Sequence, residues 1–414
     1  MIVPVPKIEE AYQRLKPIVK RTATERNLHL SELFNANIFL KREDEQIVRS
    51  YKIRGAYNNI VSRTAEELKN GIVCASAGNH AQGFALSCQL LQIKGHVFMP
   101  ITTPKQKINQ VKMFGKEMVE VKLEGDTYDD SFAKAIEFCN AGKMAFIHPF
   151  DNLDTIAGQG TIAIEILEDI EVPIDFIFLA IGGGGLASGV GSYFRQKSPN
   201  TKIIGVEPSG APSMKSSLDA NKVVTLEKID KFVDGAAVKR VGDITFDICK
   251  EVLDDMMLVP EGKTCTTILQ LYNTDGIVLE PAGSLTIAAL DYYKDKIKGK
   301  NVLCLVSGSN NDIDRMNEIK ERSLLFEGLK EYFIVNFPQR PGSLRSFLDD
   351  VLGPNDDIVR FEYLKKSSKD FGAALIGIEY KQASDCDPLT ANMTKFGFTF
   401  IRLKENPVLF DYLV

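Results

Sequence analysis

One stretch of the chain limits its possible folds more than any other: from Phe176 to Phe194 no residue carries a charge. A run of this length is long enough to suggest a membrane-spanning helix. Four consecutive glycines, Gly182 to Gly185, lie inside it, however, and glycine is a poor helix former. A strand over Phe176–Ile181, a glycine loop and a buried helix account for the whole stretch. The segment therefore predicts a strand–loop–helix unit inside a protein core, and we expect no contact with a membrane.

The composition is that of an ordinary globular protein. The 414 residues include 44% hydrophobic and 25% charged residues, and the net charge is −5. This length suggests two or three domains and a core large enough to fold without disulfides or a metal. A disordered chain, a collagen-like fibre and a disulfide-dense scaffold are excluded. Without a run of basic residues, binding to nucleic acid is not expected.

Cysteines, histidines and the N-terminus indicate the compartment. The seven cysteines form no CxxC pair, which is typical of free thiols in a reducing environment. None of the four histidines lies at metal-ligand spacing from another, so no metal is expected. The first residues, MIVPVPKIEEAYQRL, lack the apolar stretch of a signal peptide. We therefore expect a cytoplasmic protein.

Between about Ala36 and Gly308 the sequence alternates between short apolar runs and helical patterns. Several of the runs are apolar almost throughout, as parallel strands covered on both faces are. The alternation predicts an α/β fold with open, mostly parallel twisted sheets. The expected strands are Ile38–Lys41, Ile72–Ala75, His96–Met99, Glu117–Val121, Ala145–His148, Phe176–Ile181, Lys202–Glu207, Met257–Val259 and Val302–Val306. The expected helices include Thr64–Lys69, His80–Leu91, Lys105–Phe114, Asp126–Asn140 and Thr155–Glu168.

The pattern changes after about Arg322. The remaining residues read as strand, helix, strand, strand, helix, strand, which predicts a ferredoxin-like βαββαβ domain. The expected strands are Tyr332–Phe337, Asp357–Lys365, Ala373–Tyr380 and Phe398–Leu403, and the expected helices are Gly342–Val351 and Pro388–Phe396. The predicted domains are therefore residues 1–322 and 331–405, with a helical linker over Asp312–Leu329.

A lysine beside an aromatic ring is the first candidate for chemistry. The segment Ser50-Tyr51-Lys52-Ile53-Arg54-Gly55-Ala56 places Lys52 at the expected start of a helix. Partial desolvation there would lower the pKa of the amine and free it for Schiff-base formation. The alternative is a solvated lysine on the surface, which is the usual place for lysine.

Two further motifs directly follow expected strands. Ser76-Ala77-Gly78-Asn79-His80-Ala81-Gln82-Gly83 comes after Ile72–Ala75, and its small residues would let a carboxylate or phosphate approach a helix N-terminus. Ser307-Gly308-Ser309-Asn310 comes after Val302–Val306, at the strand end where α/β proteins bind ligands. Either motif could instead be a helix-capping turn.

The glycine loop Gly182-Gly183-Gly184-Gly185-Leu186 is the fourth motif. A turn without Cβ atoms lets several backbone N–H groups converge on a phosphate. A rival interpretation is a dinucleotide-binding loop, because Gly182, Gly184 and Ala187 satisfy GxGxxG/A and Glu207 ends the next strand. That interpretation leaves the lysine and serine–asparagine motifs without a role.

Taken together, the four motifs resemble those of the pyridoxal-phosphate enzymes of the tryptophan-synthase-β fold type (fold type II). Within this group the chain most resembles threonine dehydratase, a threonine ammonia-lyase, from about Val5 to Arg322, with the motifs in the same order and spacing. The tail, including Phe337-Pro338-Gln339-Arg340-Pro341-Gly342, resembles the ACT-like regulatory domain of the biosynthetic enzymes, present here in one copy.

The resemblance implies a role for each motif. Lys52 would be the catalytic residue and carry the cofactor, pyridoxal 5′-phosphate, as a Schiff base. The cofactor would also contact Tyr51, which shields its ring, Asn79, which binds its phenolic oxygen, the phosphate loop Gly182, Gly183, Gly184, Gly185 and Leu186, and Ser307, which faces its pyridine nitrogen. The substrate carboxylate would bind Ser76, Ala77, Gly78, Asn79 and His80. No metal ligand is expected among these residues.

The implied activity is the deamination of L-threonine to 2-oxobutanoate and ammonia in isoleucine biosynthesis, with L-serine as a second substrate. The resemblance also implies a homotetramer or homodimer and an amino-acid effector, isoleucine or valine. The alternatives are a serine racemase or serine dehydratase, and a non-catalytic amino-acid sensor. Serine racemases bind a divalent cation after the strand that ends at Glu207; Glu207 and Ala211 match that pattern, but Ser213 replaces the expected aspartate.

Overall fold

A computed structural model describes residues 2–363 and 370–414 of the chain. It divides into two compact units, residues 1–315 and residues 316–414. No helix within the described residues is long and apolar enough to cross a membrane. The uncharged stretch from Phe176 to Phe194 instead forms strand β7, the glycine loop and most of helix α9, as its sequence predicts.

The first unit is built on two sheets. The larger sheet has the order β1-β2-β10-β7-β8-β9, and every neighbouring pair is parallel except β1 and β2. The smaller sheet has the order β5-β4-β3-β6 and is parallel throughout. This arrangement confirms the predicted α/β fold with open, mostly parallel sheets. Its strands are β1 (Thr24–Arg26), β2 (Asn37–Arg42), β3 (Ile72–Ala75), β4 (Gly95–Met99), β5 (Val119–Leu123), β6 (Ala145–Phe146), β7 (Phe176–Ala180), β8 (Lys202–Pro208), β9 (Asp255–Val259) and β10 (Asn301–Val306).

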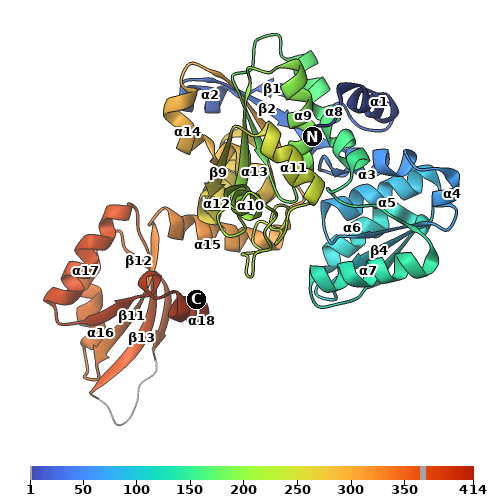
Figure 1. Cartoon of the computed structure of the whole chain (residues 1–414). Helices are drawn as coiled ribbons and strands as arrows, with labels where there is room; N and C mark the ends of the chain where they lie inside the picture. The colour runs from blue at the N-terminus through green and yellow to red at the C-terminus, as the bar shows by residue number, and fades with distance from the viewer. Residues whose placement is uncertain (1, 364–369) are drawn as a thin grey trace. The chain divides into compact units, whose positions relative to one another are not determined.

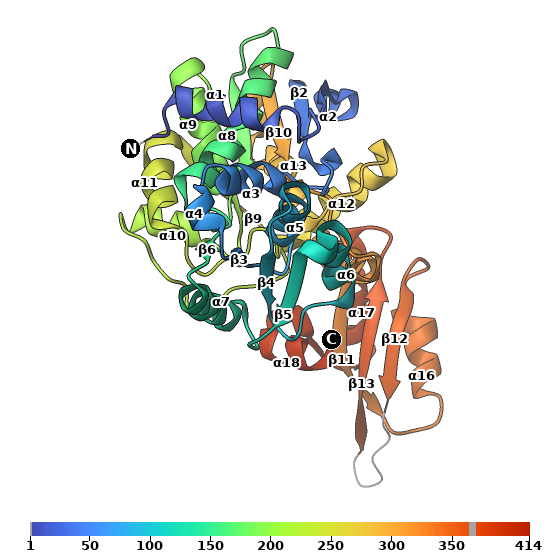
Figure 2. The same cartoon turned by 90° about the vertical axis from the view of Figure 1, so that its right-hand side faces the viewer.

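Helices of the first unit pack against these sheets (Figures 1 and 2). The core of the larger sheet joins β7, β8 and β10 to helices α8, α9 and α11, and it is mostly aliphatic. A second core joins β3 and β4 to α5 and α6. The helices are α1 (Val5–Leu15), α2 (Leu28–Phe34), α3 (Lys52–Val61), α4 (Ala65–Leu68), α5 (Asn79–Leu91), α6 (Lys105–Gly115), α7 (Tyr128–Gly142), α8 (Leu153–Asp169), α9 (Gly185–Lys197), α10 (Ser213–Asp219), α11 (Asp243–Val252), α12 (Glu261–Asp275), α13 (Pro281–Ala288) and α14 (Leu290–Ile297).

The second unit is a four-stranded antiparallel sheet with helices. Its strand order, β12-β13-β11-β14, together with the chain order of its elements, is that of a ferredoxin-like domain. Helices α16 and α17 lie on one side of the sheet, over a core rich in phenylalanine, and α18 lies on the other (Figure 1). The elements are α15 (Met316–Phe326), β11 (Lys330–Pro338), α16 (Ser343–Ser346), β12 (Asp357–Tyr363), β13 (Phe371–Glu379), α17 (Cys386–Lys395), β14 (Thr399–Arg402) and α18 (Pro407–Leu413).

Several element limits differ from the sequence-based expectations. Strand β5 begins at Val119 because Lys116–Met118 forms a 3-10 turn, and β6 ends at Phe146 rather than at His148. The helix expected over Gly342–Val351 is a short α-helix followed by a π-helical turn over Phe347–Val351. The last two residues of the strand expected over Asp357–Lys365 lie outside the described residues.

Candidate active site

Lys52 is the first residue of α3 and lies half-buried where the two sheets of the first unit meet. Its Nζ donates a hydrogen bond to the carbonyl oxygen of Pro149 at 3.2 Å, and it lies 5.3 Å from the centre of the Tyr51 ring. Burial lowers the pKa of Lys52 to about 8, although the nearby carboxylate of Glu280 raises it. The amine is therefore far easier to deprotonate than an ordinary lysine, as its motif predicts.

The segment before Lys52 is tied to the end of strand β10. Ser50 and Gly308 form an isolated antiparallel bridge, and the N–H of Tyr51 donates to the carbonyl oxygen of Ser307 at 3.3 Å. Ser307 itself is buried. The lysine and serine motifs, about 250 residues apart in the sequence, are therefore neighbours in the fold.

The glycine loop follows β7 and leads into α9. Gly184 has φ of +93°, a left-handed conformation that favours glycine. The first N–H groups of α9 have no acceptor within the helix, so this end of the helix is available to an anion. On its other side the loop is held by α11, because Thr245 Oγ1 donates to the carbonyl oxygen of Gly183 at 2.6 Å.

The segment Pro149–Asp151 joins the glycine loop to Lys52. Pro149 accepts the bond from Lys52, and the ring of the next residue, Phe150, packs directly on Gly183, where a Cβ would come within 2.5 Å of its Cδ2 atom. Asp151 Oδ1 then accepts hydrogen bonds from the N–H groups of Ile244 and Thr245 at 2.9 and 3.1 Å, at the start of α11. One short segment thus positions the lysine, the loop and the helix behind the loop.

Asn79, the first residue of α5, takes part in a chain of polar side chains. Its Nδ2 donates to Oε1 of Glu280 at 2.7 Å, and its Oδ1 accepts from Nδ2 of Asn310 at 2.7 Å. Glu280 is buried, and burial followed by repulsion from Asp234 raises its pKa to about 7, although the bond from Asn79 lowers it. The second N–H of the Asn79 amide is left for another acceptor.

The remaining residues of the predicted substrate loop, Ser76 to His80, connect β3 to α5. A Cβ on Gly78 would meet no atom within 4 Å, so the loop faces open space at this point. His80 is buried, and its Nε2 lies 3.0 Å from the carbonyl oxygen of Ile147. Burial lowers the pKa of His80 to about 3, with the charge of Lys52 acting in the same direction, so the imidazole is neutral.

Glu207, the residue of the rival dinucleotide interpretation, is occupied elsewhere. Its carboxylate accepts hydrogen bonds from the N–H groups of Met214 and Lys215 at 2.7 and 2.9 Å, and Ser213 Oγ lies 3.4 Å away. It therefore caps the start of α10. In the described part of the chain, no cluster of three or more histidine, cysteine, aspartate or glutamate side chains is placed to hold a metal ion.

Sequence reasoning missed three site residues. Pro149 and Phe150 follow a strand, but the sequence gives no sign that they contact Lys52 and Gly183. Glu280 precedes the proline-initiated helix α13 and resembles an ordinary residue before a helix. The one available signal is an acid between two apolar segments, residues 277–279 and Pro281–Ala288, because an acid in such a place is rarely left without a partner.

The assembled residues fit pyridoxal phosphate. A desolvated amine is present to condense with its aldehyde, and a glycine loop at a helix N-terminus is present to hold its phosphate. Asn79 Nδ2 has an N–H left for a phenolic oxygen. A nicotinamide dinucleotide fits less well, because Glu207 is turned into α10 and Lys52 would have no role.

Comparisons with known proteins agree with this geometry. Residues 15–308 match the family of pyridoxal-phosphate dependent enzymes, and residues 321–413 match the C-terminal regulatory domain of threonine dehydratase. The biosynthetic L-threonine dehydratase of Halalkalibacterium halodurans is 59% identical over 404 residues, covering 98% of this chain and 97% of that protein.

Solved structures give the same result. The processed form of threonine deaminase isoform 2 from Solanum lycopersicum superimposes with a TM-score of 0.74 at 38% identity, covering 78% of this chain and 90% of that one. Maize serine racemase has the same fold, with a TM-score of 0.73 but only 28% identity over 79% of this chain and 99% of that one. By its near full-length identity and its C-terminal unit, the chain belongs to the biosynthetic L-threonine dehydratases, a family of pyridoxal-phosphate-dependent enzymes.

Proposed function

We propose that this protein deaminates L-threonine to 2-oxobutanoate and ammonia, with Lys52 as its catalytic residue. The observation that carries the proposal is the half-buried, low-pKa amine of Lys52, linked through Pro149 and Phe150 to the glycine loop, in a chain 59% identical to a biosynthetic L-threonine dehydratase. When bound, pyridoxal phosphate supplies an aldehyde for the substrate amine and a ring that withdraws electrons from Cα.

Lys52 both holds the cofactor and moves the proton. Its pKa of about 8 leaves roughly a tenth of the free amine neutral at pH 7, against about one part in 3,000 for an ordinary lysine. The neutral Nζ removes the proton from Cα of threonine. The carbonyl of Pro149 restricts where Nζ points, because it accepts the amine's hydrogen bond.

Other residues bind and orient the substrate and the cofactor. The loop Ser76 to His80, at the start of α5, is placed to hold the substrate carboxylate, and Gly182 to Leu186 to hold the phosphate. Tyr51 packs beside Lys52 and limits the access of water, and Ser307 presents a neutral hydroxyl rather than a carboxylate. Loss of the β-hydroxyl as water and hydrolysis of the resulting imine then release 2-oxobutanoate and ammonia. Serine, with the same leaving group, would give pyruvate.

The second unit supports the proposal that the activity is regulated. Its match to the regulatory domain of threonine dehydratase leads us to propose residues 331–405 as an ACT-like domain that binds isoleucine, with valine as a second candidate. Such control requires an effector that binds two states of the protein differently. We further propose a cytoplasmic homo-oligomer, a tetramer or a dimer, as the working form.

Product analysis of the purified full-length protein tests the proposal. We expect a yellow protein that releases 2-oxobutanoate from L-threonine, and a threonine saturation curve that shifts when isoleucine is added. Formation of D-serine from L-serine as the main product would favour a racemase instead. A colourless protein without ketoacid release, which still binds isoleucine, would identify a non-catalytic sensor.

A further inference from the structure

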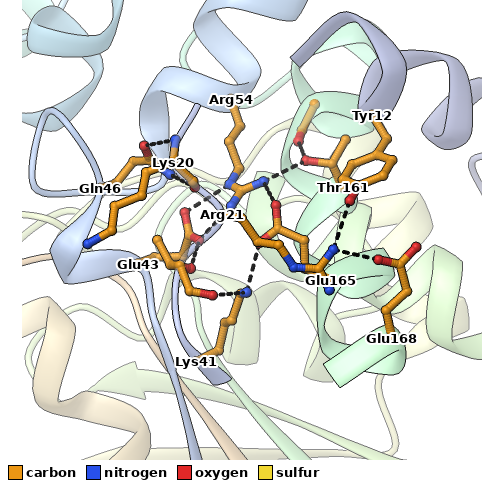
Figure 3. Close-up of polar contacts among 12 residues, drawn as sticks. Tyr12, Lys20, Arg21, Lys41, Glu43, Gln46, Arg54, Thr161, Glu165 and Glu168 are labelled. Carbon is orange, nitrogen blue, oxygen red and sulfur yellow. Dashed lines mark hydrogen bonds and ion pairs between the residues drawn. The ribbon is translucent and has the colours of Figure 1, made fainter. Parts of the chain in front are cut away.

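Four charged side chains are buried together beside the start of α3 (Figure 3). They are Lys41 of β2, Glu43 of the turn that follows it, Arg54 of α3 and Glu165 of α8, here called the buried quartet. The side chains of Lys41, Glu43 and Arg54 are 0% exposed and that of Glu165 is 1% exposed. Lysine, arginine and glutamate are almost never buried to this degree unless they are paired.

Arg54 uses every N–H group that it has. Its Nε and Nη2 donate to the two carboxylate oxygens of Glu43 at 2.9 and 2.7 Å. Its Nη1 and Nη2 donate to the two oxygens of Glu165 at 2.7 and 3.0 Å, and Nη1 also donates to Thr161 Oγ1 at 3.2 Å. Because a guanidinium group has five N–H groups in one fixed plane, these bonds fix its position and its orientation.

The rest of the cluster balances the charges. Lys41 Nζ donates to Glu165 at 2.7 Å and to the carbonyl oxygen of Thr22 at 2.8 Å, and Thr22 Oγ1 donates to Glu43 at 2.6 Å. Burial alone would raise the pKa of Glu43, but the charge and hydrogen bonds of Arg54, together with the charge of Lys41 and the bond from Thr22, outweigh burial and keep the pKa below its ordinary value. Two basic side chains thus face two acidic ones. Buried ion pairs seldom stabilise a fold more than apolar residues would, so the quartet needs a role other than net stability.

The position of Arg54 suggests that role. Arg54 follows Lys52 by two residues, within the first turn of α3. On the other side of Lys52, Ser50 is bridged to Gly308. Helix α8 approaches closely as well, since a Cβ on Gly158 would lie 2.5 Å from the carbonyl oxygen of Arg54. The lysine is therefore held between an anchor at the end of β10 and an anchor in the quartet.

We propose that Arg54 is a positioning residue for Lys52: its five hydrogen bonds to Glu43, Glu165 and Thr161 fix the first turn of α3 so that the lysine amine points at its reaction partner. The inference rests on the proposed role of Lys52. Because its N–H groups are all used within the protein, Arg54 acts through the helix that it shares with Lys52.

Arg54→Lys is the sharpest test, because it keeps the charge but replaces a planar five-donor group with a three-donor one. We expect kcat for threonine to fall about 100-fold while KM changes little, since a misplacement of about 1 Å has that effect. A second readout is independent of turnover. Borohydride reduction of the loaded full-length protein, followed by peptide mass spectrometry, should show a smaller fraction of Lys52 modified, and the pH midpoint of its visible absorbance should shift. Arg195→Lys is the matched control, since Arg195 uses its guanidinium group to bind Val252, Thr201 and Asp254 at the C-terminal end of α9, away from the quartet, and should leave both readouts unchanged.

A charge-balanced variant covers the case in which Arg54→Lys does not fold. Arg54→Met with Glu43→Gln removes one cation and one carboxylate and leaves the pair of Lys41 and Glu165 intact. We expect this variant to fold and to show the same loss of kcat and of Lys52 modification. A folded variant with wild-type kcat, Lys52 modification and spectrum overturns the inference. If wild-type protein itself is not modified at Lys52, the proposed function fails and the inference fails with it, so the two failures are distinguishable.

Discussion

A single methyl group in the glycine loop should separate packing from cofactor binding. The backbone of Gly183 is outside the left-handed region, so alanine is compatible with its conformation, unlike at Gly184 with its φ of +93°. Its Cβ, however, would lie 2.5 Å from Phe150 Cδ2 and closer still to other atoms of that ring. Ordinary contacts between such carbons are about 3.5–4.0 Å, so the ring or the loop must move by roughly 1 Å.

The consequence should reach Lys52. Phe150 directly follows Pro149, whose carbonyl holds the lysine amine, so a displaced ring displaces that acceptor. Overpacking of a core typically costs about 1–3 kcal/mol. If the loop recovers its position only on binding phosphate, this cost corresponds to a roughly 5–150-fold loss of affinity for the cofactor. We therefore expect Gly183→Ala to weaken cofactor binding by that factor, measured by titrating cofactor-free protein with pyridoxal phosphate and following its visible absorbance.

A second variant makes the prediction specific. Adding Phe150→Leu to Gly183→Ala should recover part of the lost affinity, because the smaller side chain gives the new methyl group room. Wild-type affinity in Gly183→Ala, or no recovery in the double variant, would refute the packing argument.

Four other predictions concern single groups and the second unit. Lys52→Ala should abolish the visible Schiff-base absorbance and essentially all ketoacid release; retention of more than a small fraction would show that Lys52 is misassigned. Glu280→Gln removes a charge that raises the pKa of Lys52. In a plot of kcat against pH, the acidic limb of the variant should therefore lie below about pH 8. Below about pH 7 Glu280 is protonated in the wild type, so the curves of variant and wild type should converge there. Ser307→Asp should hold a proton on the ring nitrogen and slow elimination, with more solvent deuterium found at Cα of recovered threonine; an unchanged deuterium content counts against this role for Ser307. Removal of the residues after Arg322 should leave threonine deamination but abolish the response to isoleucine, which saturation curves with and without isoleucine would show.

The fold could be predicted from the sequence where the signals are local. The buried strands of the two parallel sheets read as short apolar runs, and β3 matches its predicted range, Ile72–Ala75. Strand β1 was not foreseen, because Thr24-Glu25-Arg26 carries no apolar pattern and gains its strand character only by pairing with β2. Edge strands of this kind depend on a partner that is distant in the sequence, so a local pattern does not reveal them.

The candidate site likewise has parts with a local signal in the sequence and parts without one. Each predicted motif is a run of neighbouring residues with a recognisable local composition; three of them follow a strand, and the one around Lys52 lies at the start of a helix. The bond from Lys52 to Pro149 spans 97 residues, and the bond from Asn79 to Glu280 spans 201. Neither can be read from composition, because both depend on how the two sheets of the first unit meet. Arg54 was part of a recognised motif, yet its partner Glu165 is 111 residues away, so the buried quartet became visible only in the fold.

The glycine loop shows why a motif can be specific for more than one reason. Its four glycines suggest a cradle emptied of side chains for a phosphate. In the structure each of them also has a close protein neighbour: Ala236 behind Gly182, Phe150 against both Gly183 and Gly185, and Thr245 against Gly184. Packing alone therefore disfavours side chains on this loop, and the affinity for an anion that we propose would come from the N-terminus of α9. A sequence that satisfies both demands at once is much rarer than one that satisfies either, so the loop is a more specific motif than its four glycines alone suggest.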